Sequence, residues 1–501
     1  MNNSSLNSNA FTKNIGFVRN LNSLENVFLK NVLNNNLVAT SISRFSRRLN
    51  NEFLKDSIAI ITNHNELLKA CVSESEGGVF INYKDFSTVH YEYRESDFPI
   101  KITNINIREI TGMDSNILTI ILNNYGDSSD IVTCFNHVLF DGISLDYIMD
   151  DIYRVYISLE EGHDPKIKDR RIDYSILEQQ NVNINNEIFY DYFLNLLQRY
   201  YNILFQSLVN YNNLYLDECM SYLKDTIYKN TESSNRLNIN NNSNSNSNSN
   251  SDSIDYYFNL IKDYKVNSFD KLDILETNKR FSKIKCLTTI SLPKNTTSNV
   301  LKNIELHKIS LFSYVSAVVC HLLKNNYSTQ KYNNIQILTF LNLRYLKHFD
   351  YSYKHQGLLA FPLYFNVNTT DKDNIWEQGR EIYEYIAEIN EKANPSTISA
   401  ILDTLNNMNS FFYKTYLDLT KFETRYIDIQ VNYLGVIKNY KSLHLNKSEV
   451  FIHNETELIP KLHIYLYILR GQLFISISSA FIHESNHTSI VNDFKSMLSY
   501  V

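Results

Sequence analysis

Glycine and proline are scarce in this chain of 501 residues. Eleven glycines and six prolines make up about 3 % of the sequence, against about 12 % in ordinary proteins. This scarcity excludes collagen-like and glycine-rich folds, and it predicts that each remaining glycine stands where the backbone needs one. Aromatic residues, by contrast, are 13 % of the chain. That much ring surface can build a core, which excludes a wholly disordered protein.

Paired cysteines and an excess of positive charge are also missing. The five cysteines are scattered and none forms a C-x-x-C pair, so a zinc ribbon, a thioredoxin-type site and a disulfide framework have no basis. We expect buried thiols in a reducing compartment. The net charge is −6 and no long Lys/Arg block occurs, which leaves no electrostatic footprint for nucleic acid or an anionic membrane.

No hydrophobic run is long enough for a membrane span. Residues 1–14 lack the apolar region of a secretory signal. The most apolar late stretch, 463–482, is interrupted by Arg470, Gly471 and Gln472, so we expect it not to cross a bilayer. These absences predict a cytoplasmic protein, which we also expect to be a monomer.

The chain divides by composition into four parts. Residues 1–14 are polar and predicted to be disordered. Two globular lobes are expected at 15–170 and 285–501, and a helical connector at 171–284 separates them. Within the connector, 231–253 is an Asn/Ser tract that cannot offset its ordering entropy. Strands and helices mix in both lobes, so the predicted class is α/β or α+β.

Hydrophobic periodicity predicts the individual elements. In the first lobe we expect a strand at 37–44, a helix within 49–68, a hairpin of 116–122 and 131–135 with its turn near Gly126, and a helix capped by Ser144. In the second we expect strands at 287–293, 337–346, 357–368 and 427–437, more strands within 449–482, a short helix capped by Thr296 or Thr297, and helices at 309–323 (capped by Ser310), 371–394 and 485–500. An aromatic helical pattern at 185–210 indicates core or inter-lobe packing, with a membrane or partner face as the alternative.

The densest chemical signal is the sequence H-x-x-x-D-G, formed by His137, Asp141 and Gly142 between a buried strand and a helix. A strand end projects His137 in a fixed direction, and Asp141 turns back towards the same corner. Gly142 is expected to adopt a backbone conformation that a β-carbon would hinder. A neutral imidazole held at such a corner suits a general base. The alternative is a hydrogen-bonded structural corner without catalytic use.

At these residues the chain resembles the acyltransferases built like chloramphenicol acetyltransferase. That family includes peptide-synthetase condensation domains, alcohol acetyltransferases, polyketide-associated acyltransferases and the plant BAHD enzymes. HVLFDG (137–142) is similar to the family's central signature, and FLNLR (340–344), QGLLAFPLYFNV (356–367) and VNYLG (431–435) are similar to its later motifs. Segments 47–72 and 288–323 resemble the openings of its two lobes. The resemblance covers about 15–170 and 285–501, and 171–284 is unmatched.

The resemblance implies a two-lobe fold, each lobe a mixed sheet flanked by helices, with an active-site tunnel between them. It implies that His137 deprotonates an acceptor hydroxyl or amine, which attacks a thioester carbonyl. Asp141 is then a structural residue paired with Arg344, and Gly142 keeps the channel clear. No metal and no cofactor is implied, because acyl-CoA is a co-substrate. The donor to the oxyanion is not identified by the motifs; Asn342 and Asn432 are the candidates.

Departures from the family's sequence pattern narrow the reaction that we expect. Asn136 stands where condensation domains usually have another histidine, which disfavours peptide-synthetase-type amide formation. The D-F-G-W-G stretch of the plant subgroup is missing, and no carrier-protein or adenylation segment is attached. We therefore expect a stand-alone enzyme that transfers an acyl group from acyl-CoA to a small alcohol or amine. Two alternatives stay open: an acyl carrier protein as donor, and a catalytically idle two-lobe interaction module.

Overall fold

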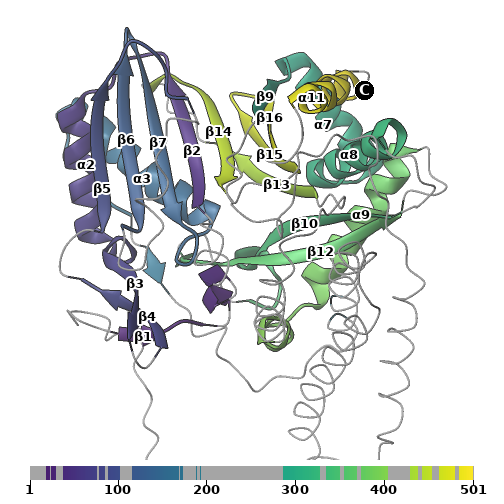
Figure 1. Ribbon diagram of the computed structural model, residues 1–501, viewed down its shortest axis with the longest axis horizontal. Coiled ribbons are helices and arrows are strands. Elements are labelled where there is room, and N and C mark those ends of the chain that lie inside the picture. Colours follow the sequence, from purple (N-terminus) through teal and green to yellow (C-terminus); the bar gives the residue numbers. More distant parts are fainter. Residues whose placement is uncertain are drawn as a thin grey trace, which may run out of the picture.

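The computed structural model shows two sheets side by side, each flanked by helices (Figure 1). This is the mixed α/β architecture expected from the sequence. The residues that the structure describes are 18–22, 24–26, 28–29, 38–75, 78–84, 88–101, 116–168, 170–172, 188, 192, 286–327, 334–349, 355–368, 374–403, 429–437, 443–453, 462–479 and 484–499. The predicted disordered start, the Asn/Ser tract and nearly all of the predicted helix at 185–210 lie outside these residues.

The N-terminal lobe is built on a five-stranded sheet. Its strand order is β14-β2-β7-β6-β5, in which only β5 and β6 run parallel. The elements of this lobe are β2 (Val38–Phe45), α2 (Asn51–His64), β5 (Val89–Glu95), β6 (Leu118–Tyr125), β7 (Ser128–Asn136) and α3 (Gly142–Glu160). A smaller sheet holds β1 (Val18–Asn20), β4 (Gly78–Tyr83) and β3 (Ala70–Ser75), the last preceded by a 3-10 turn at Glu66–Lys69.

The predicted hairpin is confirmed, and Gly126 occupies its turn with φ +51°. β7 has a hydrogen-bonded neighbour on each side and is buried along almost its whole length. α2 lies at the outer side of the sheet and packs against α3 (Figure 1). The C-terminal end of β7 is therefore held firmly inside the lobe, and that end leads into the H-x-x-x-D-G motif.

The C-terminal lobe is built on a six-stranded sheet of order β12-β10-β13-β15-β16-β9. The pairs β10–β13 and β13–β15 are parallel and the others antiparallel. Its elements are β9 (Cys286–Ser291), α7 (Lys294–His307), α8 (Leu311–Tyr327), β10 (Asn334–Asn342), β12 (Ala360–Asn368), α9 (Ile375–Lys392), β13 (Ile429–Val436), β15 (Leu462–Leu469), β16 (Gln472–Ser479) and α11 (Glu484–Ser499). Each corresponds to a predicted element, with ends displaced by a few residues.

Two strand pairings join parts of the chain that are far apart in sequence. β14 (Leu445–His453) follows β13 in the chain, yet it pairs antiparallel with β2, so one strand from the expected second lobe completes the sheet of the first (Figure 1). In addition, β8 (Arg171–Ile172) pairs in parallel with β11 (His355–Gln356). The sheet of the first lobe therefore contains a strand from beyond the predicted boundary at 285.

Two predicted helix caps are wrong. α3 begins at Gly142 with Asp141 as its N-cap, and Ser144 is the residue whose N–H is capped. α7 has Pro293 at its N-cap position without any side-chain cap, and it is 14 residues long rather than short. Thr297 lies inside this helix, where its hydroxyl oxygen accepts a hydrogen bond from the backbone N–H of Leu473 at 3.0 Å. The cap at Ser310 is confirmed, because its Oγ accepts from the N–H of Ser313 at 3.0 Å.

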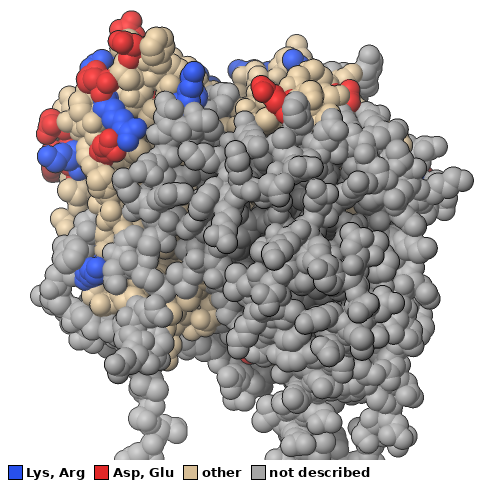
Figure 2. Space-filling view, viewed as in Figure 1, with Lys and Arg blue, Asp and Glu red and all other residues tan. Residues whose placement is uncertain are grey.

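The expectation of buried thiols is met by the four cysteines within the described ranges, Cys71, Cys134, Cys286 and Cys320. Burial raises the pKa of the Cys134 thiol to about 11. Among the described helices, none is long and apolar enough to cross a membrane by itself, although α7 and α8 pass that test as a bent pair. Side chains of both charge signs lie close together on the described surface of the N-terminal lobe (Figure 2). Arg48 and Glu95 of this lobe form an ion pair.

Candidate active site

The H-x-x-x-D-G motif forms a tight corner between β7 and α3. Asn136 ends the strand, and its Oδ1 accepts a hydrogen bond from the N–H of Val138 at 2.9 Å. Residues 137–139 then form a turn. Asp141 adopts the extended backbone of an N-cap (φ −98°, ψ 170°), and its Oδ1 accepts from the N–H of Ser144 at 2.7 Å. This satisfies one of the unpaired donors at the start of α3 and fixes the Asp141 carboxylate.

Arg344 meets this carboxylate from the other lobe, as the family resemblance implied. Its Nη1 lies 2.7 Å from Oδ2 of Asp141 and its Nη2 lies 3.3 Å from Oδ1, a two-pronged ion pair. The side chains of Arg344 and Asp141 are 0 % and 4 % exposed. The N–H of Leu359 also donates to Oδ2, at 2.9 Å. Burial alone would raise the pKa of Asp141, but the charge and hydrogen bonds of Arg344, together with the N–H groups of Ser144 and Leu359, outweigh it and lower that pKa.

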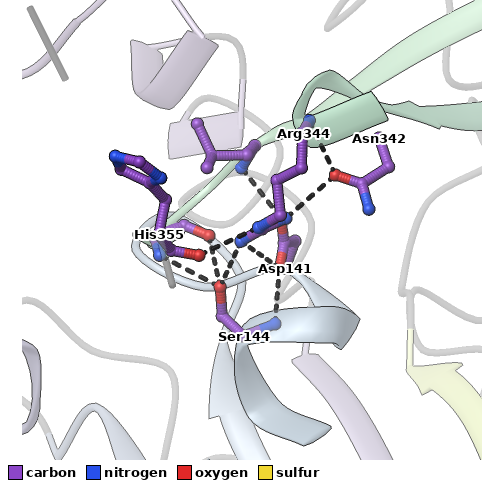
Figure 3. A network of polar contacts seen from close by, with 7 residues as sticks. Asp141, Ser144, Asn342, Arg344 and His355 are labelled. Carbon is purple, nitrogen blue, oxygen red and sulfur yellow. Dashed lines mark hydrogen bonds and ion pairs between the residues drawn. The ribbon is translucent and has the colours of Figure 1, made fainter. Parts of the chain in front are cut away.

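Ser144 is a second centre of the same network, and the sequence reading missed its role (Figure 3). Its Oγ donates to the carbonyl of Gly357 at 2.7 Å and accepts from Nη2 of Arg344 at 2.8 Å. Arg344 also donates through Nε to the carbonyl of His355 at 2.9 Å. The position of Ser144, three residues after an N-cap Asp141, is the signal that could have placed it beside the carboxylate.

Aromatic rings enclose His137, which is 7 % exposed. Phe28 stacks on the imidazole with ring centroids 4.8 Å apart and planes inclined by 26°. Phe135 lies at 5.5 Å and Phe340 at 6.5 Å, both tilted. The sequence reading did not connect these phenylalanines with the motif. Phe135 comes from β7 itself, Phe340 from β10 in the other lobe, and Phe28 from a helical segment near the start of the chain.

The two ring nitrogens of His137 differ in their surroundings. Nδ1 is enclosed and has no hydrogen-bond partner of ordinary geometry. With Nδ1 enclosed, Nε2 is the ring nitrogen that remains for a substrate. Burial lowers the pKa of His137 below its usual value, and this outweighs the opposing effects of its own backbone and of the Asp141 charge. At neutral pH the imidazole is therefore uncharged.

The two asparagines considered as oxyanion donors, Asn342 and Asn432, leave different side-chain atoms unpaired. Oδ1 of Asn342 accepts from the N–H of Arg344 at 3.0 Å and from Nη1 of Arg344 at 3.1 Å, which fixes the orientation of the amide. Its Nδ2 is then an enclosed donor without a partner. In Asn432 the enclosed atom without a partner is the acceptor Oδ1, while the side chain bonds to Tyr465. An oxyanion needs donors, so of the two only Asn342 offers the required group.

Gly142 does not have the special backbone that the sequence reading assigned to it. It is the first residue of α3, and its φ is not in the positive region. A β-carbon placed on it meets no atom within 4 Å, so it borders open space. The backbone argument for Gly142 was wrong because an N1 position of a helix accepts any residue that fits it. Among the described residues no group of three His, Cys, Asp or Glu side chains is arranged to hold a metal ion.

The two-lobe fold is shared with solved structures of condensation and epimerization domains and of an acetyltransferase. The chain is similar to the epimerization domain of the third module of tyrocidine synthetase B (TM-score 0.62, 11 % identity, covering 97 % of this chain and 96 % of that one). It is also similar to trichothecene 15-O-acetyltransferase from Fusarium sporotrichioides (0.60, 11 %, 97 % and 95 %) and to polyketide synthase associated protein 5 from Mycobacterium tuberculosis (0.55, 11 %, 97 % and 98 %).

These likenesses confirm the predicted two-lobe fold of the chloramphenicol acetyltransferase and condensation-domain type. At identities this low they establish the fold and not the reaction, since one fold can carry several activities. No protein-family model and no curated protein sequence matches the chain. The function therefore has to be argued from the site.

Proposed function

We propose that this protein is an acyltransferase that moves an acyl group from a CoA thioester to the hydroxyl or amine of a small acceptor, with His137 as general base. The observation that carries the proposal is the state of the imidazole. It is uncharged, held at a rigid strand–helix corner, and enclosed at Nδ1. A base of this kind accepts a proton when a substrate reaches Nε2, and it needs no metal.

The proposed reaction has two stages. The acceptor oxygen or nitrogen attacks the thioester carbonyl as Nε2 of His137 takes its proton, so a new carbon–oxygen or carbon–nitrogen bond forms and the carbonyl oxygen becomes an oxyanion. The carbon–sulfur bond then breaks, and the departing CoA thiolate recovers the proton from the imidazolium. The products are the ester or amide and free CoA. No covalent acyl-enzyme is required.

Asn342 is our proposed donor to the oxyanion. Its amide is oriented by Arg344 and leaves Nδ2 unpaired. A buried donor without a partner lowers the stability of the fold unless a ligand accepts its hydrogen bond. Asn342 and Phe340 are two residues apart on β10 and share a face of the strand, about 7 Å apart. Phe340 contacts His137, so Asn342 lies on the same side as the base. A preorganised donor there stabilises negative charge as it develops.

Asp141 and Arg344 have a supporting role in this proposal. Their ion pair, with Ser144 and the segment after β11, joins the start of α3 to the opposite lobe. His137 precedes Asp141 by four residues. The ion pair between Asp141 and Arg344 therefore sets the position of the base between the lobes. This is positioning rather than proton transfer, because the lowered pKa of Asp141 keeps it ionised at neutral pH.

The test is a transfer assay with the purified chain, a panel of acyl-CoA donors and a panel of small alcohols and amines, read by the appearance of free CoA thiol. His137→Ala should lower turnover by roughly 10²–10⁴-fold with donor binding retained. His487→Ala is the matched control, a buried histidine of α11 that bonds to Ser479 and Thr288 away from the motif.

Three other results would decide between the alternatives. Turnover with an acylated carrier protein and none with acyl-CoA would replace the donor while keeping the base. No turnover with any donor would favour the interaction module. Full turnover in a folded His137→Ala protein would refute the proposed base.

A further inference from the structure

One side of α3 carries a row of four polar side chains. Asp141, Ser144, Tyr147 and Asp151 follow one another at spacings of three, three and four residues, which makes them neighbours along one face of a helix. Arg344 bonds to the first two, at the N-terminal end of α3. The other two lie about one and two turns further along the helix, and they are contacted by a second arginine.

That second arginine is Arg170, which follows α3 in the chain and folds back onto it. Its Nε lies 2.9 Å from Oδ2 of Asp151 and its Nη2 lies 3.0 Å from Oδ1, so two edges of the guanidinium fork are used. The side chains of Arg170 and Asp151 are 8 % and 6 % exposed. A two-pronged ion pair shielded from water holds the planar guanidinium in one orientation.

Tyr147 contacts both arginines. The guanidinium carbon of Arg170 lies 4.7 Å from the centre of the Tyr147 ring, and that of Arg344 lies 6.0 Å from it. These distances are within the range in which a cation is attracted to an aromatic face. One ring can serve two cations here because each arginine is paired with its own carboxylate. A change at Arg170 therefore reaches Arg344 through the ring.

The backbone after Arg170 reaches Arg344 by a second route. The next two residues form β8, which pairs with β11. The carbonyl of His355, the first residue of β11, accepts a hydrogen bond from Nε of Arg344 at 2.9 Å (Figure 3). The carbonyl of Gly357, directly after β11, accepts from Oγ of Ser144 at 2.7 Å. The acceptors that hold Arg344 and Ser144 therefore depend on the position of β11, which β8 fixes.

We propose that Arg170 is a positioning residue of the active site, which holds Arg344 through the ring of Tyr147 and through the pairing of β8 with β11. This inference rests on the proposed role of His137 as general base. Arg344 fixes Asp141, and the corner that contains Asp141 also contains the base. Arg170 acts through Arg344 and takes no part in proton transfer. A displacement of about 1 Å in such a site can lower the rate by roughly 100-fold.

The experiment compares Arg170→Gln with Lys168→Gln. Lys168 is the matched control, because it belongs to the same segment and pairs with the neighbouring carboxylate of Asp150 at 2.9 Å, whereas Arg170 lies over Tyr147. In this control Asp150 keeps Arg154 as a partner, at 3.1 Å. Arg170→Lys keeps the charge without the planar fork, and it replaces Arg170→Gln if the latter does not fold.

Two readouts separate positioning from a general loss of stability. The first is kcat and KM, measured with the most reactive acyl-CoA and acceptor of the two panels, well below the melting temperature of each variant. The second is solvent exchange of the Nε–H proton of Arg344, followed by NMR and assigned by the resonance missing from Arg344→Lys. It reports on the hydrogen bond to the carbonyl of His355 and does not depend on turnover.

We expect Arg170→Gln to lower kcat by roughly 10- to 100-fold with KM nearly unchanged, and to speed exchange of the Arg344 Nε–H by about 10-fold. Arg170→Lys should lie between this variant and the wild type. Lys168→Gln should match the wild type in both readouts.

Equal kcat and equal exchange in Arg170→Gln and Lys168→Gln would overturn the positioning role while leaving the base intact. Faster exchange of the Arg344 proton without a loss of kcat would confine Arg170 to the fold and would also overturn that role. A folded His137→Ala protein that retains turnover refutes the base itself, and faster exchange in Arg170→Gln would in that case still support the contact between Arg170 and Arg344.

Discussion

Breaking the ion pair between Asp141 and Arg344 should destabilise the protein strongly from either side. The two side chains are almost fully buried and joined at 2.7 and 3.3 Å. Arg344→Ala leaves Asp141 with only the N–H groups of Ser144 and Leu359. Asp141→Ala leaves Arg344 with neutral acceptors alone. Removing one partner of a buried pair typically costs about 3–5 kcal/mol.

The double variant tests whether this cost comes from the pair. Once one charge has been removed, removing the second no longer leaves a charge unpaired, so the two losses should overlap by about 0.5–3 kcal/mol. Urea unfolding of the wild type, both single variants and the double variant measures the overlap. Additive losses within about 0.5 kcal/mol would refute the reasoning.

A matched pair shows whether activity is linked to this particular site. Arg44 and Asp130 are joined at 2.9 Å in the sheet of the N-terminal lobe, and the Asp130 side chain is fully buried. Arg44→Ala should reduce stability with little effect on turnover of the remaining folded protein. Arg344→Ala should reduce both, because its partner Asp141 lies four residues after His137 in the corner that holds the base.

Three further predictions concern acid, the oxyanion and the connector. The lowered pKa of Asp141 stabilises the fold. This stabilisation is complete above the unfolded pKa of about 3.9 and is lost as pH falls through the folded pKa. The melting temperature should therefore fall less steeply from pH 7 to pH 3 for Asp141→Asn than for the wild type, and parallel curves would contradict this cause. Asn342→Ala should lower kcat by roughly 10²–10³-fold and Asn432→Ala much less, and equal effects in a steady-state assay would remove Asn342 as the oxyanion donor. Deleting residues 231–253, which are nearly without apolar side chains, should change the melting midpoint by no more than a few degrees, because long insertions cost little; a larger drop in calorimetry would show that the tract packs on a lobe.

Most of the secondary structure could be predicted because local patterns specify it. The apolar runs around Gly126 and the repeat that became α2 are signals within one short window of sequence. Helix starts were less predictable. Ser144 and Thr297 have cap-forming side chains, but tertiary contacts use those hydroxyls elsewhere, and Asp141 and Pro293 take the cap positions instead.

The site could be predicted only where a motif or family resemblance placed it. His137, Asp141 and Arg344 came from such motifs, and the structure brings the last two together. Phe28 lies 109 residues before His137 and carries no local signal that it stacks on the imidazole. Side chains that meet only through the fold leave no pattern in one sequence.

The position of β14 in the first sheet has a consequence for how the chain folds during synthesis. β2 pairs with β14 along the register from Phe45–Leu445 to Val38–His453, so one edge of β2 waits for residues made some 400 positions later. Until then that edge exposes unpaired backbone groups, the usual starting point for strand-to-strand aggregation. Contacts this distant in sequence also form slowly. A nascent chain that ends after the first lobe should therefore depend on chaperones until the ribosome has released β14.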